Sequence, residues 1–389
     1  MDLITTTDDL AALCRRLGDA EYVAVDTEFM RERTFWPRLC LVQVAANDEA
    51  VAIDPLAEGI DLAPLHELLC DARLLKVFHA ARQDCEVLHH LSGRVPAPLF
   101  DTQVAAMVCG LGDSVSYASL AATLAKARID KSSRFTDWSR RPLTKRQLSY
   151  AIDDVRHLRL IYERLSRRLE SSGRAGWVAE EMTTLTDPRQ YEQRPEDAWR
   201  RIKSRSSDRR FLAILREVAA WREQRAQERD LPRNWVVRDE ALLEIAAHAP
   251  DSLEDLAHTR GLSQTSVKGS MGRGILAAVE RGRALPEAEC PRVDKPRQAP
   301  RGAGPVADLL KVLLKLKCDE HGVAQRLVAS VADLERIAGE DAPDVPALRG
   351  WRREIFGADA LAVKQGKLTL VVRDRRVILA SLDQDGPAD

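Results

Sequence analysis

Short apolar runs joined by short polar connections mark the first half of the chain. Five runs are expected as strands: residues 22–26, 39–45, 51–54, 74–79 and 99–101. The first two are apolar on both faces, as expected of central strands. The fourth run leads into a helical pattern, and helical periodicity follows the fifth run to about residue 185. Three strands on short connections, followed by strand and helix in alternation, predict an α/β domain: a mixed sheet with helices packed on it.

The second half of the chain has a helical pattern. Phe211, Leu215 and Val218 share one helix face, and Ser252 with Asp255 three residues later has the form of a helix start. The apolar positions of residues 309–316 predict another helix. Near the end of the chain, three alternating apolar positions indicate a small hairpin: Leu368, Leu370 and Val372.

One proline-rich stretch divides this helical half. Five of the 18 prolines lie at positions 286, 291, 296, 300 and 305, with almost nothing apolar to bury between them. Such a stretch is typical of an extended linker. We therefore expect a first domain at residues 1–195, a helical domain at 207–285, a linker at 286–304 and a second helical domain at 305–381.

Composition narrows the class of protein. The chain has 389 residues, 45% of them apolar and 31% charged, which excludes disorder throughout and a membrane protein. The N-terminus has no basic segment followed by an apolar one, so we expect no secretory signal. The seven cysteines are odd in number and never form a Cys-x-x-Cys pair. We therefore expect reduced thiols in the cytoplasm, with no disulfide framework and no structural zinc.

Charge is balanced overall but uneven along the chain. The 59 basic and 60 acidic residues give a net charge of −1. Residues 200–216 nevertheless contain seven basic side chains and a single acid, Asp208. A run of this kind is usually a solvated face. Its position between two predicted domains favours a surface that follows the phosphates of a nucleic acid.

Carboxylates stand where the predicted strands end. Asp26 and Glu28 are two residues apart on one strand, so both project from the same face and repel each other unless a cation lies between them. Asp84 follows the fourth strand, and Tyr150 and Asp154 share one face of a predicted helix. Taken singly, Asp26 and Glu28 are also explained by a polar turn, and Asp84 by the first turn of a helix. The complete set in this order is what points to chemistry.

The same residues carry a resemblance to a known family. Residues 23–34 and 36–43 resemble the first exonuclease motif of the ribonuclease D family, and residues 79–88 resemble its second motif. Residues 100–103 match the following segment, and residues 150–155 match the third motif. The match covers nearly all of the predicted first domain. It implies a ribonuclease-H-like 3′–5′ exonuclease domain over residues 1–195.

The resemblance also implies the residues that carry the chemistry. Two divalent ions, Mg²⁺ or Mn²⁺, would be held by Asp26, Glu28, Asp84 and Asp154. A sister group has a histidine five residues before the last acid, where this chain has Ser149, while Tyr150 lies four residues before it. The chain is therefore expected in the tyrosine branch, with Tyr150 orienting the attacking water. Phe29 and His79 are candidates for contacting the last nucleotide, although either could equally be packed core.

Residues 207–282 resemble the helical HRDC module of ribonuclease D and of some helicases, and the third block resembles a second, more divergent copy. No Gly-x-x-x-x-Gly-Lys-Ser/Thr loop occurs, so we expect no ATP binding. We expect a monomeric, cytoplasmic 3′–5′ exoribonuclease, without membrane contact, that releases 5′-mononucleotides from precursor tRNA. The alternatives are a DNA exonuclease of the same superfamily and a non-catalytic RNA-binding scaffold. A scaffold has no need to keep all four carboxylates and the tyrosine.

Overall fold

The computed structural model describes residues 3–47, 49–130, 133, 136–292 and 302–382. Its main sheet has six strands in the order β1-β4-β3-β2-β5-β6. β3 is antiparallel to β2 and β4, whereas the pairs β1–β4, β2–β5 and β5–β6 are parallel, so the sheet is mixed as predicted. The strands are β1 (Leu3–Ile4), β2 (Tyr22–Met30), β3 (Arg38–Ala46), β4 (Glu49–Ile53), β5 (Leu75–Phe78) and β6 (Leu99–Asp101).

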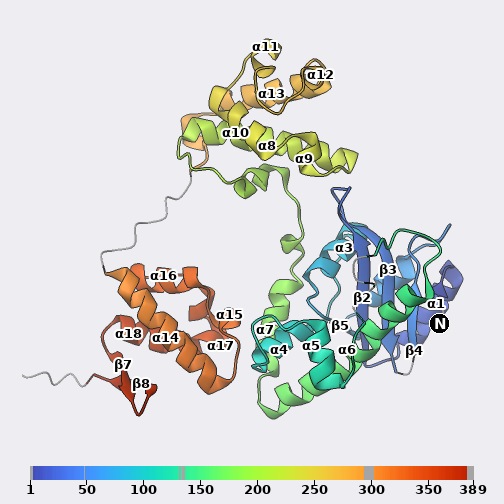
Figure 1. The fold of residues 1–389 in the computed structure, drawn as a ribbon, viewed down its shortest axis with the longest axis vertical. Coiled ribbons are helices and arrows are strands. Elements are labelled where there is room, and N and C mark those ends of the chain that lie inside the picture. The colour runs from blue at the N-terminus through green and yellow to red at the C-terminus, as the bar shows by residue number, and fades with distance from the viewer. Residues whose placement is uncertain (1–2, 48, 131–132, 134–135, 293–301, 383–389) are drawn as a thin grey trace, which may run out of the picture.

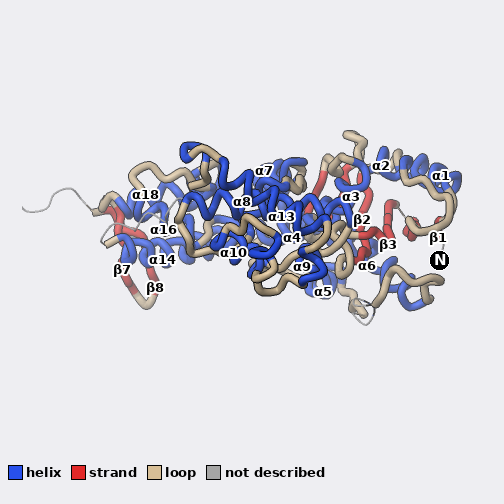
Figure 2. The backbone as a smooth tube through the Cα atoms, turned by 90° about the horizontal axis from the view of Figure 1, so that it is seen from above, coloured by secondary structure: helices blue, strands red, loops and turns tan. Residues whose placement is uncertain are grey.

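Helices cover both faces of this sheet (Figures 1 and 2). One face carries α1 (Thr7–Leu17), α2 (Ala63–Leu69) and α3 (Arg82–Ser92), and the other carries α6 (Lys145–Ser171). Val23 and Val25 of β2 belong to the core that includes α1, α2 and α3, while Ala24 packs against Val155 and Leu158 of α6. Because side chains alternate along a strand, the even-numbered positions that follow on β2 also face α6.

Three shorter helices complete the nuclease domain: α4 (Thr102–Val108), α5 (Tyr117–Leu120) and α7 (Ala175–Leu185). The expectation of helix to about residue 185 was wrong for residues 109–116, and also for residues 126–130 and 136–144, which form a loop. The guanidinium of Arg141 holds this loop against the sheet, because it donates to both carboxylate oxygens of buried Asp54 at 2.6 Å. A side-chain pair 87 residues apart in sequence overrides the local helical pattern here.

The second block is all-helical, as its pattern predicts. It contains α8 (Arg209–Arg229), α9 (Arg233–Val236), α10 (Asp239–His248), α11 (Leu253–Leu256), α12 (Gln264–Val267) and α13 (Ser270–Ala284). Ser252 caps α11 by accepting from the backbone N–H of Asp255 at 3.1 Å, which confirms the predicted helix start.

Much of the basic run at residues 200–216 serves this fold. Arg210 donates to the carbonyl oxygens of Gly282, Arg283 and Leu285 at 2.7–3.0 Å and so satisfies the end of α13. Arg209 donates to the carbonyl of Cys290 at 3.2 Å. Two further members form ion pairs with acids of α8: Arg201 with Glu223 at 3.6 Å and Arg216 with Glu217 at 3.1 Å.

The third block is a helical cluster that ends in a hairpin. Its elements are α14 (Ala303–His321), α15 (Gln325–Val328), α16 (Val331–Gly339), α17 (Gly350–Arg352), α18 (Ala358–Lys364), β7 (Leu368–Arg373) and β8 (Arg376–Ser381). The hairpin confirms the alternation seen in the sequence. Most of the predicted linker, residues 293–301, lies outside the described residues, and α14 begins two residues before the expected domain start.

Both helical blocks contact the nuclease domain. In the third block, Trp351 stacks on Trp177 of α7 with ring centroids 4.4 Å apart and planes at 8°, and Arg352 pairs with Glu181 at 2.6 Å. In the second block, the core includes Phe35, which lies in the loop between β2 and β3. Among the helices of the described residues, none is long and apolar enough to cross a membrane.

Candidate active site

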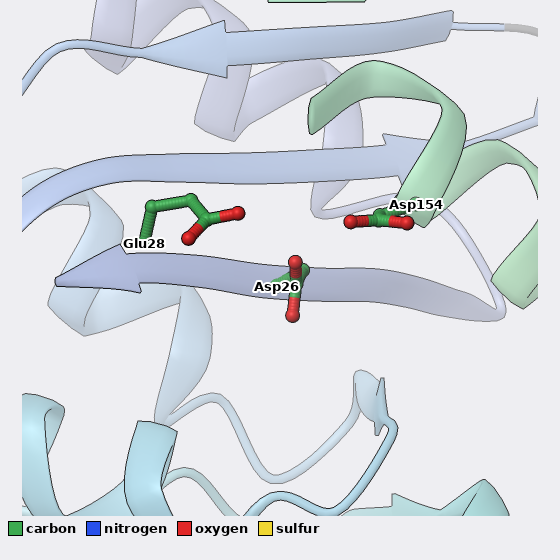
Figure 3. Close-up of side chains that lie close together, drawn as sticks. All are labelled: Asp26, Glu28 and Asp154. Atoms are coloured by element: carbon green, nitrogen blue, oxygen red, sulfur yellow. The ribbon is translucent and has the colours of Figure 1, made fainter. Parts of the chain in front are cut away.

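Three carboxylates meet on the α6 face of the sheet. Asp26 and Glu28 of β2 and Asp154 of α6 each place an oxygen so that all three lie within 4.8 Å of one another (Figure 3). The strand alternation explains the first two, and α6 crossing this face brings the third. Asp154 is buried, whereas Asp26 and Glu28 are half-buried and so are open to a small ligand. The predicted proximity of these three residues is confirmed.

The fourth predicted carboxylate, Asp84, lies on the other side of β2. It belongs to the first turn of α3 and is not among the three clustered residues. The side chain of Thr27 points to the opposite face of β2 from Asp26 and Glu28. Its hydroxyl donates a hydrogen bond of 2.5 Å to Asp84 Oδ1. The charge of Asp26 nevertheless raises the pKa of Asp84, so the two carboxylates act on each other across the strand.

Burial and mutual repulsion disfavour the ionised form of these carboxyl groups when no cation is bound. Loss of solvent, and then the charge of Asp154, raise the pKa of Asp26 from 3.8 to about 8. Burial and the charge of Asp26 likewise raise the pKa of Asp84 well above its ordinary value. Clustered, desolvated carboxylates with oxygen ligands suit a hard divalent cation, which would relieve both causes together. The residues present therefore fit such an ion.

Tyr150 lies on α6 one turn before Asp154, as its spacing predicts. Its hydroxyl is hydrogen-bonded to the Asp154 side chain. Burial, and then the charges of Asp154, Glu28 and Asp26, raise the pKa of the phenol well above its ordinary range. The hydroxyl therefore stays protonated near neutral pH, which suits a donor or positioning group better than a base.

A second tyrosine, Tyr117, fixes the helix that carries Asp154. Its hydroxyl donates to the backbone carbonyl of Asp154 and lies 3.2 Å from that of Asp153. Its ring meets His79 edge to face, with centroids 5.6 Å apart. Tyr117 is the first residue of the short helix α5, in a stretch with no periodic or motif signal, so sequence reasoning missed it.

His79 and Phe29, the two candidates for nucleotide contact, differ in their surroundings. The hydroxyl of Thr102 donates to the carbonyl of Phe78, so its oxygen must accept from His79 Nδ1 at 3.0 Å. This assigns the proton of the neutral ring to Nδ1 and leaves Nε2 as an acceptor; burial lowers the pKa of the imidazole. Phe29 is half-buried, with the guanidinium of Arg31 5.9 Å from its ring centroid.

Asp101 shapes the turn that leads to Asp84. Its two carboxylate oxygens accept from the backbone N–H groups of Ala80 and Ala81, both at 2.9 Å. Ala80 has a φ of 58°, a left-handed conformation that costs a residue with a Cβ and needs support from its surroundings. The buried carboxylate supplies that support and so sets the direction in which α3 begins. The sequence places Asp101 in a motif but gives no sign of this role.

Comparison with known proteins agrees with this arrangement. A family model described as 3′-5′ exonuclease matches residues 1–170, and one for the HRDC domain matches residues 211–279. The fold and site thus define a 3′–5′ exonuclease joined to an HRDC domain. Enzymes of this class generally use divalent metal ions.

Relatives over the whole length narrow the assignment. A ribonuclease D of Nitrobacter hamburgensis is 53% identical over 97% of this chain and 99% of its own, and one of Gluconacetobacter diazotrophicus is 52% identical over 96% and 95%. The crystal structure of Escherichia coli RNase D, described as an exoribonuclease involved in structured RNA processing, is 35% identical. It covers 94% of this chain and 98% of its own with a TM-score of 0.81. The chain belongs to the ribonuclease D family and is a hydrolytic 3′–5′ exoribonuclease.

Proposed function

We propose that the site holds two divalent ions, Mg²⁺ or Mn²⁺, and trims the 3′ ends of precursor tRNA to release 5′-mononucleotides. Asp26, Glu28 and Asp154 would hold the ions from the α6 face of β2, and Asp84 from the other side. The observation that carries this proposal is that one carboxylate oxygen from each of three residues lies within 4.8 Å of the others. The raised pKa of Asp26 supports it, because a bound cation would relieve the repulsion that causes the shift.

The protein's own residues divide the work. When bound, the ions lower the pKa of a bound water and offset negative charge on the phosphodiester and on the leaving 3′ oxygen. Asp26 lies beside Asp154 in the carboxylate cluster, and its charge also raises the pKa of Asp84. Its carboxylate is therefore the one suited to serve both ions.

Tyr150 orients the attacking water in this proposal. Its phenol stays protonated, since burial and three carboxylates hold its pKa high, and it is anchored to Asp154 by a hydrogen bond. A protonated hydroxyl fixed in this way can direct a lone pair of the water toward phosphorus but cannot take its proton.

We propose precursor tRNA as the substrate, which is more specific than the structured RNA named for a relative. RNase D of Escherichia coli is described as acting in structured RNA processing, and an enzyme with the same domain order suits a folded substrate with a single-stranded 3′ end. The seven cysteines are all free thiols, in agreement with an enzyme of the reducing cytoplasm. We propose a monomer, since the site needs no residue from a second copy.

A directional assay tests the proposal. The purified protein is incubated with a precursor tRNA labelled at its 3′ end or at its 5′ end, with Mg²⁺, with Mn²⁺ or with excess chelator. We expect the 3′ label to leave first as a 5′-mononucleotide, the 5′-labelled RNA to shorten stepwise, and the chelator to stop both. Internal cleavage, or full activity in chelator, would contradict the proposal.

A further inference from the structure

A groove of 590 Å³ lies between the nuclease domain and the second block. The nuclease side contributes the loop between β2 and β3, and the other side is formed by the segment before α8 and by α9. Its lining includes Arg31, Trp36, Arg201, Arg233, Asn234 and Trp235. Nothing in the ligand set described above uses this groove.

One end of the groove is lined by residues that closely follow the proposed ligands in sequence. Arg31 lies three residues beyond Glu28, and its guanidinium sits 5.9 Å from the ring centroid of Phe29. The same guanidinium pairs at 2.6 Å with Glu86, two residues after Asp84 on α3. One wall of the groove is therefore continuous with both elements that present the proposed ligands.

The lining has the chemistry of a nucleic-acid surface. Four arginines and two acids line it. Arg31 pairs with Glu86 at 2.6 Å and Arg222 with Asp239 at 2.5 Å. Arg201 and Arg233 share one buried acid, Glu223, at 3.6 and 2.5 Å, so the arginines outnumber the acids that they contact by one. The indole of Trp235 is 62% exposed, an unusual position for so large an apolar ring. Two other aromatic rings already have partners, since Trp36 stacks on His90 and Phe35 lies under Arg233.

We infer that this groove holds the single-stranded RNA that leads to the active site, with a base stacked on Trp235 and phosphates near the arginines. A base must leave its helix before an aromatic side chain can stack on it, so a single strand fits and a duplex does not. The inference rests on the proposed function, because it assigns the groove to the same RNA. It also limits the expected phosphate contacts within residues 200–216 to Arg201, because Arg209 and Arg210 donate to carbonyl groups of the second block.

Binding in an inactive background tests the inference. In the Asp26→Asn protein, the dissociation constant is measured for an unstructured 12-nucleotide RNA and for a trinucleotide, with and without Trp235→Ala. Stacking on one aromatic side chain contributes ~1–3 kcal/mol, so we expect Trp235→Ala to weaken binding of the 12-mer ~5- to 150-fold. Trinucleotide binding should not change, and Trp235→Phe should restore most of the lost affinity.

Matched controls separate this role from a loss of folding. Leu309→Ala removes an exposed apolar side chain from α14, and Arg273→Ala removes an exposed charge from α13; neither should affect either RNA. Equal 12-mer affinity with and without Trp235→Ala overturns the inference. So does an equal loss for 12-mer and trinucleotide, which would place the effect in the nuclease site, and so does tighter binding of a DNA 12-mer of the same sequence. Failure of the proposed function appears instead as intact RNA when the unmodified enzyme is given metal.

Discussion

The hydroxyl of Thr27 donates a hydrogen bond of 2.5 Å to Asp84, the one proposed ligand that lies apart from the other three. Thr27 stands between Asp26 and Glu28 on β2, with its side chain on the opposite face. One strand thus presents two carboxylates directly and holds a third through the residue between them. The bond also lowers the pKa of Asp84, against the burial that raises it.

Removing this hydroxyl should raise the concentration of metal that the enzyme needs. Thr27→Val keeps the shape of the buried side chain but leaves Asp84 without this donor, so its carboxylate is harder to ionise. We expect the Mg²⁺ concentration for half-maximal activity to rise ~10-fold or more, while activity at saturating metal falls less. Thr27→Ser keeps the hydroxyl and should stay near the unmodified protein. Equal metal requirements for the valine and serine variants would contradict the positioning role.

Asp26→Asn should abolish most turnover and leave RNA binding largely intact. The change preserves the side-chain shape but removes the charge that faces both Asp154 and Asp84. Loss of one oxyanion-stabilising donor alone costs ~10²–10³ in rate, so we expect at least that loss in single-turnover hydrolysis. Asp19→Asn, at an exposed position, is the matched control. Near-normal hydrolysis by the Asp26 variant would refute a metal site at these carboxylates.

Tyr150→Phe should slow the chemical step without changing its pH optimum. The phenol positions water but does not titrate near neutral pH, because burial and neighbouring carboxylates hold its pKa high. Single-turnover rates and metal affinity should be measured separately, with a strong effect on the first and little on the second. Tyr162→Phe on the same helix serves as the control and should have no effect. If Tyr150→Phe leaves the single-turnover rate unchanged, Tyr150 is only a packing residue.

The metal-free protein should lose stability as the pH rises. An aspartate has an ordinary pKa of 3.8, which we take for the unfolded state, and the pKa of Asp26 in the folded protein is about 8. Between these two pH values the folded state therefore binds more protons than the unfolded state. Stability therefore falls with rising pH over this range, and metal affinity rises because binding displaces the proton. Thermal unfolding with chelator and with Mg²⁺ across this range measures both effects.

Asp26→Asn provides the comparison for this pH series. It removes the titrating group, so the metal-free variant should show a shallower fall in melting temperature with pH. Stabilisation by Mg²⁺ should also be smaller at every pH. A metal-free protein that becomes more stable with pH, relative to this variant, would contradict the raised pKa.

The stack between Trp177 and Trp351 should hold the third block on the nuclease domain. Trp177→Ala removes a ring that lies 4.4 Å from its partner, and such pairs contribute ~0.5–1.5 kcal/mol beyond the area they bury. Hydrogen exchange should rise in α17 and α14 while the main sheet stays protected. Trp235→Ala removes an exposed indole of the same size and should leave this exchange pattern unchanged. An unchanged pattern in the Trp177 variant would assign the docking to Arg352 and Glu181 instead.

Local pattern was enough to predict β2 to β6 and two pairs of site residues, whereas the joining of these pairs with Asp84 into one ligand set came from the family resemblance. The period of two on β2 places Asp26 and Glu28 on one face, and the period of α6 adds Tyr150 and Asp154, because both follow from the backbone alone. β1 was missed because two residues are too few to show a period. The loop after α5 was wrongly predicted as helix because the Arg141–Asp54 pair that shapes it is a tertiary contact.

The supporting residues could not be found in this way. Thr27, Asp101 and Tyr117 act through partners 57, 21 and 37 residues away in sequence. A threonine in a strand or a tyrosine at the start of a short helix has no local feature that identifies its partner. The partners of Arg201, Arg209 and Arg210 could not be predicted for the same reason, since their carbonyl and carboxylate acceptors become neighbours only in the folded second block.

Phe35 belongs to the nuclease domain by sequence and to the second block by packing. It is 9% exposed within that block's core, and the backbone N–H groups of Phe35 and Trp36 donate to Asp230 at 3.0 and 2.9 Å. The nuclease domain and the second block are therefore not structurally independent of each other. A chimera that exchanges the HRDC domain must carry a compatible β2–β3 loop. Because this loop directly follows β2, its packing also restricts the end of the strand that bears Asp26 and Glu28.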